Sequence, residues 1–335
     1  INELRKLNGL PGHPDVHTPH IVTNTGSLGM GISKSKGMVI AHRLQGISRK
    51  IFVLLGDGEL QEGQIWESLL SANHAKMGEI TIIVDHNKLQ SDTLVSEVSD
   101  LGDLELRFAA HGCEVLRCDG HDMDTISKSF KKLDRIKDRP KVIIADTIKS
   151  KGAKLMESTL FRKEDRLYQF HSGAPEWEVY QESLDALIMS VNQRLKDNGE
   201  AQLEITSLPK PLILRSRAKK SERLIDAYAR ALLKQAEQHS ELVVLSGDLA
   251  YDTGLIDFEK RFPERFFECG IAEQDMVSQA GGIALRGGLP VVHSFSCFLT
   301  TRANEQIYNN ATEETSIVYV GSLAGLLPGM PGHSH

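Results

Sequence analysis

Two apolar runs in the first half of the chain lack the alternating polar residues of a half-exposed strand. They span residues 50–55 and 80–84 and are rich in β-branched and aromatic side chains. Such runs predict strands of a parallel sheet that are buried on both faces. Between them, residues 62–73 have apolar positions at helical spacing, which predicts a crossover helix. The order strand, helix, strand therefore predicts a parallel α/β unit.

The same alternation continues along the chain and predicts an α/β fold with two doubly wound parallel-sheet domains. Further strands are expected at residues 113–117, 141–145, 242–245, 266–268, 290–293 and 317–320, and helices at 176–196, 222–238 and 273–285. Two prolines and a basic patch mark residues 197–218 as a linker. We therefore predict a first domain over residues 1–196 and a second over residues 219–335. Residues 150–172 are too many for an ordinary connector, so this segment is a candidate active-site loop.

Composition excludes several classes of protein. The 335 residues, 40% hydrophobic and 25% charged, suit two α/β domains of ordinary size. A net charge of −6 with both signs interspersed gives no basic surface for nucleic acid. No apolar stretch approaches the roughly 20 residues of a membrane span, and no signal peptide opens the chain. The four cysteines show no metal-ligand spacing, so we expect reduced thiols in the cytoplasm.

Polar residues follow the first two predicted strands. Asp57 lies in a Gly-Asp-Gly segment, and Asn87 lies 30 positions later (87 − 57 = 30). Parallel strands bring both to the same sheet edge, where open α/β sheets bind ligands. Carboxylate and amide oxygens suit Mg²⁺, which takes its other ligands from phosphate and water, and Gly58 leaves an N–H free to approach that phosphate. We interpret the pair as a magnesium diphosphate clamp; a strand-ending turn and a capping Asn are the alternative.

With this pair placed, the chain resembles the transketolase family of thiamine diphosphate enzymes over essentially its whole length. Residues 56–63 (GDGELQEG), followed by Trp66 and Glu67, are similar to transketolases. Residues 270–276 (GIAEQDM) are similar to two-subunit bacterial transketolases and to deoxyxylulose phosphate synthases. The chain looks like the two bacterial halves joined together.

The resemblance implies two cofactors, thiamine diphosphate and Mg²⁺, with Ca²⁺ or Mn²⁺ as substitutes for the metal. It implies Asp57, Asn87 and the backbone carbonyl of Leu89 as metal ligands. Residues of both domains are implied to contact the diphosphate, the aminopyrimidine or its aromatic wall: Gly58, His171, Gly26, Leu28, Asp248, Phe295 and Phe298.

Glu273 matches the acid on which the family's chemistry depends. A carboxyl at the pyrimidine N1′ favours the tautomer whose imino group removes the proton from thiazolium C2. Ionising a carboxyl among Phe and Leu side chains is costly, so we expect the pKa of Glu273 to be raised. The resemblance also implies Glu62 in a carboxyl network, His13 beside the thiazolium and substrate, and His335 as a further active-site histidine.

Each residue also has a structural interpretation when it is taken alone. A Glu that opens a helix is favoured by the helix dipole, Phe298 by itself is typical of a core, and His13 and His171 are typical of loops. Only the joint order, with the clamp first and the glutamate second, favours the functional interpretation.

The resemblance implies transfer of a two-carbon ketol unit from a ketose to an aldehyde, in a homodimer whose cofactor lies between subunits. One alternative is a decarboxylating synthase that joins a 2-oxo acid to an aldehyde, which residues 270–276 permit. Another is a non-catalytic, assembly-forming relative that keeps the fold. Neither nucleic acid nor membrane is expected as a partner.

Departures from the family pattern concern the substrate end of the site. Leu323 stands where transketolases usually carry a histidine, and Met330-Pro331 stand where they carry an acidic pair. These positions serve sugar hydroxyls and phosphate, so a standard phosphosugar substrate is in question, and Arg217 and Arg302 are the candidate cations. Both ends of the chain read as cut, and the family's third, carboxy-terminal domain is not expected in it.

Overall fold

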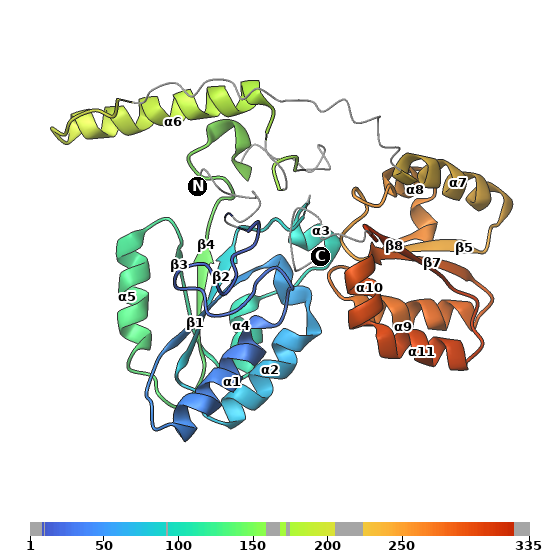
Figure 1. Cartoon of the computed structure of the whole chain (residues 1–335), viewed down its shortest axis with the longest axis horizontal. Coiled ribbons are helices and arrows are strands. Elements are labelled where there is room, and N and C mark those ends of the chain that lie inside the picture. Colours follow the sequence, from blue (N-terminus) through green and yellow to red (C-terminus); the bar gives the residue numbers. More distant parts are fainter. Residues whose placement is uncertain are drawn as a thin grey trace.

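The computed structural model describes residues 9, 11–91, 93–158, 168–171, 175–204 and 224–324. Within these ranges it contains two four-stranded sheets, each entirely parallel. The sheets lie in separate halves of the molecule (Figure 1). This confirms the predicted α/β class with two parallel-sheet domains.

The first sheet has the strand order β1-β2-β4-β3. Its strands are β1 (Ile51–Gly56), β2 (Ile80–His86), β3 (Glu114–Asp119) and β4 (Lys141–Asp146). Its helices are α1 (Gly31–Leu44), α2 (Gly63–His74), α3 (Val95–Val98), α4 (Leu104–Ala110) and α5 (Met123–Leu133), with the 3₁₀ turns η1 (Gly58–Gln61) and η2 (Lys154–Met156). Helix α5 lies on one side of the sheet, and α1 and α2 lie on the other (Figure 1). The crossover helix predicted between the first two strands is α2.

The second sheet has the order β6-β5-β7-β8. Its strands are β5 (Leu242–Ser246), β6 (Phe266–Glu268), β7 (Leu289–Phe295) and β8 (Val318–Ser322). Helices α7 (Leu224–Gln238) and α8 (Ile256–Arg261) cover one face, beside the 3₁₀ turn η5 (Pro263–Arg265). Helices α9 (Glu273–Ala284), α10 (Ser296–Arg302) and α11 (Asn304–Thr312) cover the other. Every strand predicted in this half is present.

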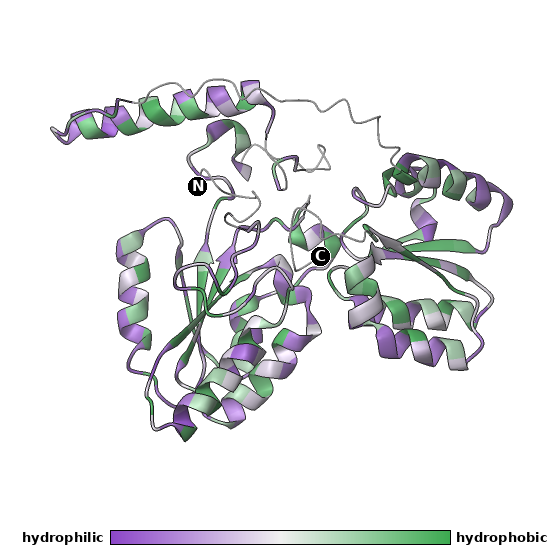
Figure 2. Cartoon of the chain, viewed as in Figure 1, coloured by the Kyte–Doolittle hydropathy of each residue, from purple (hydrophilic) through white to green (hydrophobic). Residues whose placement is uncertain are grey.

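The apolar faces of these helices and strands form separate cores in the two halves. The first core is centred on β2, whose Ile80, Ile82 and Val84 are fully buried. The second half has one cluster on each face of its sheet, around Val244 and around Val292. Hydrophobic residues accordingly make up much of the strands of both sheets (Figure 2). Burial of these faces stabilises each half by about 25 cal/mol for every Å² of apolar surface removed from water.

The prediction that both opening strands are buried on two faces is wrong for β1. Its residues alternate between buried and exposed, and Phe52 and Leu54 are 56% and 72% exposed. Strand β1 stands at the edge of the sheet. Helix α1 packs on the other face of this strand, and on the exposed face Phe52 meets only the edge of the Phe130 ring of α5 among the described aromatic rings, with ring centres 5.7 Å apart.

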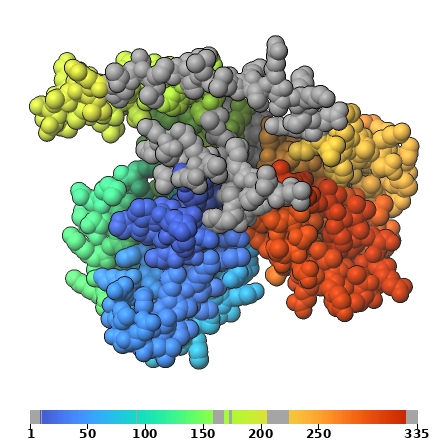
Figure 3. All heavy atoms as spheres, in the orientation of Figure 1, coloured from blue at the N-terminus to red at the C-terminus, as the bar shows by residue number. Residues whose placement is uncertain are grey.

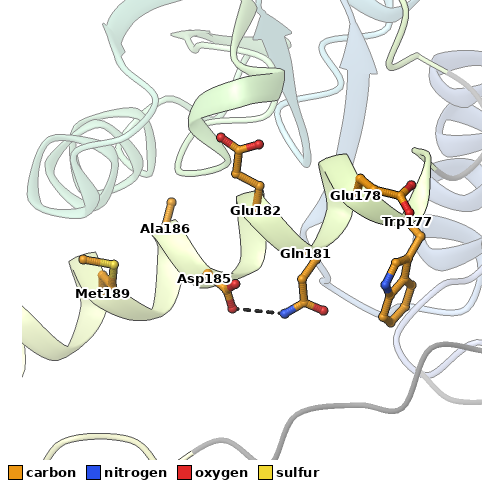
Figure 4. A pocket seen from close by; sticks show the side chains of 7 residues that line it. All are labelled: Trp177, Glu178, Gln181, Glu182, Asp185, Ala186 and Met189. Carbon is orange, nitrogen blue, oxygen red and sulfur yellow. Dashed lines mark hydrogen bonds between the residues drawn. The ribbon is translucent and has the colours of Figure 1, made fainter.

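Helix α6 (Trp177–Asp197) extends away from the first sheet (Figure 1). Only Ser183 of this helix is buried. The hollow beside it, of about 650 Å³, is walled by side chains of the helix itself (Figure 4). None of the described helices is both long enough and apolar enough to cross a membrane.

Candidate cofactor site

The loop after β2 is held against the carboxyl end of β1 by Asp57. Its Oδ2 accepts a hydrogen bond from the Lys88 N–H at 2.6 Å. Asn87 Oδ1 accepts from the Leu89 N–H at 3.0 Å, and Asn87 Nδ2 donates to Asp85 Oδ2 at 3.3 Å. The structure therefore brings the predicted metal ligands Asp57, Asn87 and Leu89 to one sheet edge, because β1 and β2 are paired in parallel up to Gly56 and Asp85.

The surroundings of Asp57 fit a bound cation. The residue is 2% exposed, and burial raises the pKa of its carboxyl, although the N–H groups of Lys88 and Gly58 partly offset this effect. No described lysine, arginine or histidine forms an ion pair with it. A buried carboxylate is costly without a positive partner, and a divalent cation would supply one. Among the described residues, no three or more His, Cys, Asp or Glu side chains are grouped so that they could hold a metal ion. The predicted ligands are not such a group, because Asp57 is the only one of them with a side chain of these types.

The N–H of Gly58 was expected to be free, but in the structure it is already hydrogen-bonded. That N–H donates to Asp57 Oδ1 at 2.9 Å. A Cβ at this position would lie 2.6 Å from the Cβ of the buried Gln90. Glycine is therefore required here for the close packing of η1 against the loop after β2, and contact with a diphosphate remains a prediction.

A guanidinium joins the two halves of the molecule at Glu273. Arg302 Nη1, at the end of α10, lies 2.5 Å from Glu62 Oε1 and 3.0 and 3.1 Å from the two oxygens of Glu273. Its Cζ lies 4.4 Å from the centre of the Phe298 ring. The side chains of Glu62, Glu273 and Arg302 are 12%, 2% and 13% exposed, so these three groups interact away from bulk water.

This arrangement changes the ionisation of Glu62. Burial raises the pKa of Glu62 to about 8; the positive charge of Arg302 opposes this rise, and the carboxylates of Glu273 and Glu59 add to it. Glu59 lies in the same turn, where its oxygens accept hydrogen bonds from the N–H groups of Gly29 and Gly56. Glu62 and Glu273 are thus joined through Arg302, which was expected from the sequence to be a substrate contact; a carboxyl network at the cofactor stays a prediction.

A cavity of about 850 Å³ lies beside this network, and its lining residues come from both halves of the molecule, which lie side by side in Figure 3. Leu28, Glu62, Glu273 and Arg302 line it. Leu28 follows Gly26, whose φ of +94° lies in the left-handed region that favours glycine. The aromatic pair Phe295 and Phe298, with ring centres 5.9 Å apart, stands at the junction of β7 and α10.

A second contact between the halves involves Asp248, which follows β5. Its Oδ2 accepts a hydrogen bond from Ser91 Oγ at 2.8 Å, and Gln90 also hydrogen-bonds its carboxylate. Its φ is +62°, a strained conformation that Asp tolerates better than most residues. Burial raises the pKa of Asp248, and the positive charge of Lys149 acts in the opposite direction.

Lys149 contacts one of the two predicted histidines, and the other acts on the same histidine through its charge. Its Nζ lies 2.8 Å from His171 Nδ1. Partial burial, then the positive charges of Lys149 and His13, lower the pKa of His171 to about 4, although the residue as a whole is exposed. His13, Lys149 and His171 thus form a group beside Asp248, and neutral His171 can accept a hydrogen bond there.

Lys149, Glu59 and the role of Arg302 were not predicted from the sequence. Lys149 follows β4 as Asp57 follows β1, so its place after a strand was an available signal. Nothing local indicated Arg302, because its partners lie 240 and 29 positions away. His335 and Arg217 lie outside the described residues, and Leu323 is 62% exposed.

Comparison with known proteins agrees with this geometry. The transketolase thiamine diphosphate binding domain matches residues 1–161, and the transketolase pyrimidine binding domain matches residues 222–335. The chain belongs to the transketolase family. It has the family's thiamine diphosphate-binding domains, with Asp57 and Asn87 in the first and Glu273 in the second.

Named relatives give the same family. Transketolase-like protein 2 of Mus musculus is 33% identical over 345 residues, which cover 99% of this chain and 53% of that protein. The transketolase of Homo sapiens is 29% identical over 340 residues, which cover 99% of this chain and 53% of that protein. The solved transketolase of Campylobacter jejuni has 21% identity and a TM-score of 0.45, over 95% of this chain and 55% of that one. This chain spans about half the length of the animal transketolase relatives that it matches.

Proposed function

We propose that this transketolase-family chain is part of a Mg²⁺- and thiamine diphosphate-dependent transferase that moves a two-carbon ketol unit from a ketose to an aldehyde. The observation that carries the proposal is the meeting of two features across the domain boundary. One is the buried Asp57 clamp at the edge of the first sheet, and the other is Glu273, held beside Glu62.

In this proposal Asp57, Asn87 and the Leu89 carbonyl hold the metal, and Ca²⁺ or Mn²⁺ can replace Mg²⁺ because all three ligands are oxygens. Lys149 and neutral His171 provide a cation and a hydrogen-bond acceptor at the same edge. Bound thiamine diphosphate supplies the electron sink for cleavage and formation of the carbon–carbon bond.

Glu273 acts as the acid toward the ring nitrogen, and Glu62 holds a proton next to it. Because the pKa of Glu62 is raised to about 8, this carboxyl is mostly protonated at neutral pH. Arg302 contacts both carboxyls through one nitrogen, so a change of charge on either acid acts directly on the other. Phe298, beneath the guanidinium, gives the apolar side of this environment.

The test uses Glu273→Ala, with Asp275→Ala as the matched control. Asp275 is an exposed acid in the same first turn of α9, so both variants remove the same favourable interaction with the helix dipole. We expect Glu273→Ala to lose hydrogen–deuterium exchange at C2 of bound thiamine diphosphate together with ketol transfer, and Asp275→Ala to retain both. Full exchange in Glu273→Ala would overturn the proposal.

Two measurements separate this function from its rivals. Release of CO₂ from pyruvate by the complete protein would favour a decarboxylating synthase. Absence of thiamine diphosphate binding with Mg²⁺ in calorimetry would favour a non-catalytic relative. The small-molecule substrates are otherwise a ketose donor and an aldehyde acceptor.

We also propose a homodimer with the cofactor between subunits, in which the contacts that the two domains make within the described chain are made between two copies. Mixing the Asp57→Ala and Glu273→Ala variants tests this arrangement. Random pairing gives half heterodimers with one intact site of two, so activity should recover to about a quarter of wild type. No recovery of activity would refute a cofactor site that is shared between two copies. A cytoplasmic location is proposed because all four cysteines are free thiols.

A further inference from the structure

The side chain of Gln61 connects the first domain to the backbone that leads into Glu273. Its Oε1 accepts a hydrogen bond from the Ile271 N–H at 2.9 Å. Its Nε2 donates to Gln90 Oε1 at 2.7 Å and to the Ser99 carbonyl at 3.1 Å. Both amide hydrogens and the oxygen are therefore used, and the two donor bonds fix which end of the amide faces the second domain.

The segment that receives this hydrogen bond has little freedom of its own. Gly270 has φ of +74°, and a Cβ there would lie 2.6 Å from Gln61 Oε1 and 3.2 Å from the Cβ of Ser99. The Gly270 N–H donates to Glu268 Oε1 at 3.1 Å. Gly270 is thus held from one side by its own domain and from the other by Gln61, in a conformation that other residues rarely adopt.

Glutamine is the side chain that this position requires. Glutamate has no N–H to donate to Gln90 and the Ser99 carbonyl, and its charge would be placed against a carbonyl oxygen. Leucine has a similar size but leaves the Ile271 N–H without its acceptor, and Ile271 is buried. An unsatisfied buried N–H destabilises the arrangement that contains it.

The position of Glu273 depends on this joint because Ile271 precedes it by only two residues. Glu273 is the first residue of α9, so a displacement of the Ile271 backbone shifts the start of the helix and the carboxyl with it. The carboxyl must meet a ring nitrogen within hydrogen-bond distance. A misplacement of about 1 Å in such a contact costs on the order of a hundredfold in rate.

We propose that Gln61 is a positioning residue that sets the placement of Glu273 relative to the diphosphate clamp. This inference rests on the proposed role of Glu273. It concerns the docking of two domains and holds whether these domains belong to one chain or to two copies of it.

The experiment compares two quantities in the complete protein. The first is the Kd of thiamine diphosphate with Mg²⁺, measured by calorimetry, and the second is the rate of C2 hydrogen exchange in the bound cofactor. For Gln61→Leu we expect exchange to fall about ten- to a hundredfold, with Kd changed by less than about threefold, because the clamp belongs to the first domain. The control is Gln193→Leu, an exposed glutamine whose Nε2 bonds Asp197 within α6, which should leave both quantities unchanged.

Gly270→Ala perturbs the same joint from the second domain, because the added Cβ would lie 2.6 Å from Gln61 Oε1. It should reproduce the selective loss of exchange, and it keeps the inference testable if Gln61→Leu does not fold. Wild-type exchange in either folded variant would overturn the inference, as would a parallel loss of exchange and affinity in both. Equal exchange in wild type and Glu273→Ala would instead refute the proposed function.

Discussion

Glu62 gives a prediction that requires no substrate. Burial is the main cause that raises the pKa of Glu62 to about 8 in the folded protein, against an ordinary value of 4.5. At neutral pH the group is therefore mostly protonated when folded and ionised when unfolded. Between these two pKa values the folded state binds more protons, so the stability contributed by Glu62 falls as pH rises from 4.5 toward 8 and then levels off.

The size of this effect follows from the difference in pKa. That difference is about 3.5 (8 − 4.5), and each unit corresponds to about 1.36 kcal/mol, so the upper bound is on the order of 5 kcal/mol. Other buried acids, such as Glu268, whose pKa burial raises to about 7, titrate in the same range. They are present in wild type and variant alike, so a comparison of the two isolates Glu62.

The perturbation is Glu62→Gln, which resembles the protonated carboxyl in size and cannot ionise. Urea unfolding is followed near the two ends of the window, at about pH 5 and about pH 8. We expect the variant to gain several kcal/mol relative to wild type as pH rises. Glu67→Gln is the control because Glu67 is exposed on α2, the helix that begins directly after Glu62. Parallel pH dependence of wild type and Glu62→Gln would refute the burial of an uncharged Glu62 in this network.

Three further predictions address the surroundings of the site. Arg302→Met leaves two buried carboxyls without their shared cation and should lower the free energy of unfolding by about 3–5 kcal/mol; unchanged urea unfolding would contradict it. Asp85→Leu removes the acceptor that orients the Asn87 amide and should weaken Mg²⁺ affinity about 10- to 100-fold in calorimetry; an unchanged Kd would argue against this role. Gly58→Ala forces a Cβ against Gln90 and should lower the free energy of unfolding by about 1–3 kcal/mol, measured by thermal unfolding. Wild-type stability of this variant would show that the loop after β2 can move to accommodate the added methyl group.

Much of the fold was predictable because its signals are local. Every predicted strand was found within two residues of its expected bounds, since an apolar run bounded by polar residues marks a strand without reference to the rest of the chain. Burial of each face was less predictable. Phe52 and Leu54 belong to an apolar run, but the edge position of β1 leaves them exposed, and strand order is a property of the whole sheet.

The amino-acid sequence by itself determined the alternation of strands and helices, the placement of Asp57 and Asn87 at strand ends, and the family. These follow from short-range spacing and from chain connectivity. Only the tertiary structure decided that Arg302 lies between Glu62 and Glu273, that Lys149 meets His171, and that Gln61 bonds the Ile271 N–H. The physical reason is that these contacts join residues from different segments of the chain, and packing within the first domain or between the two domains, rather than any local preference, selects the partner of each polar group.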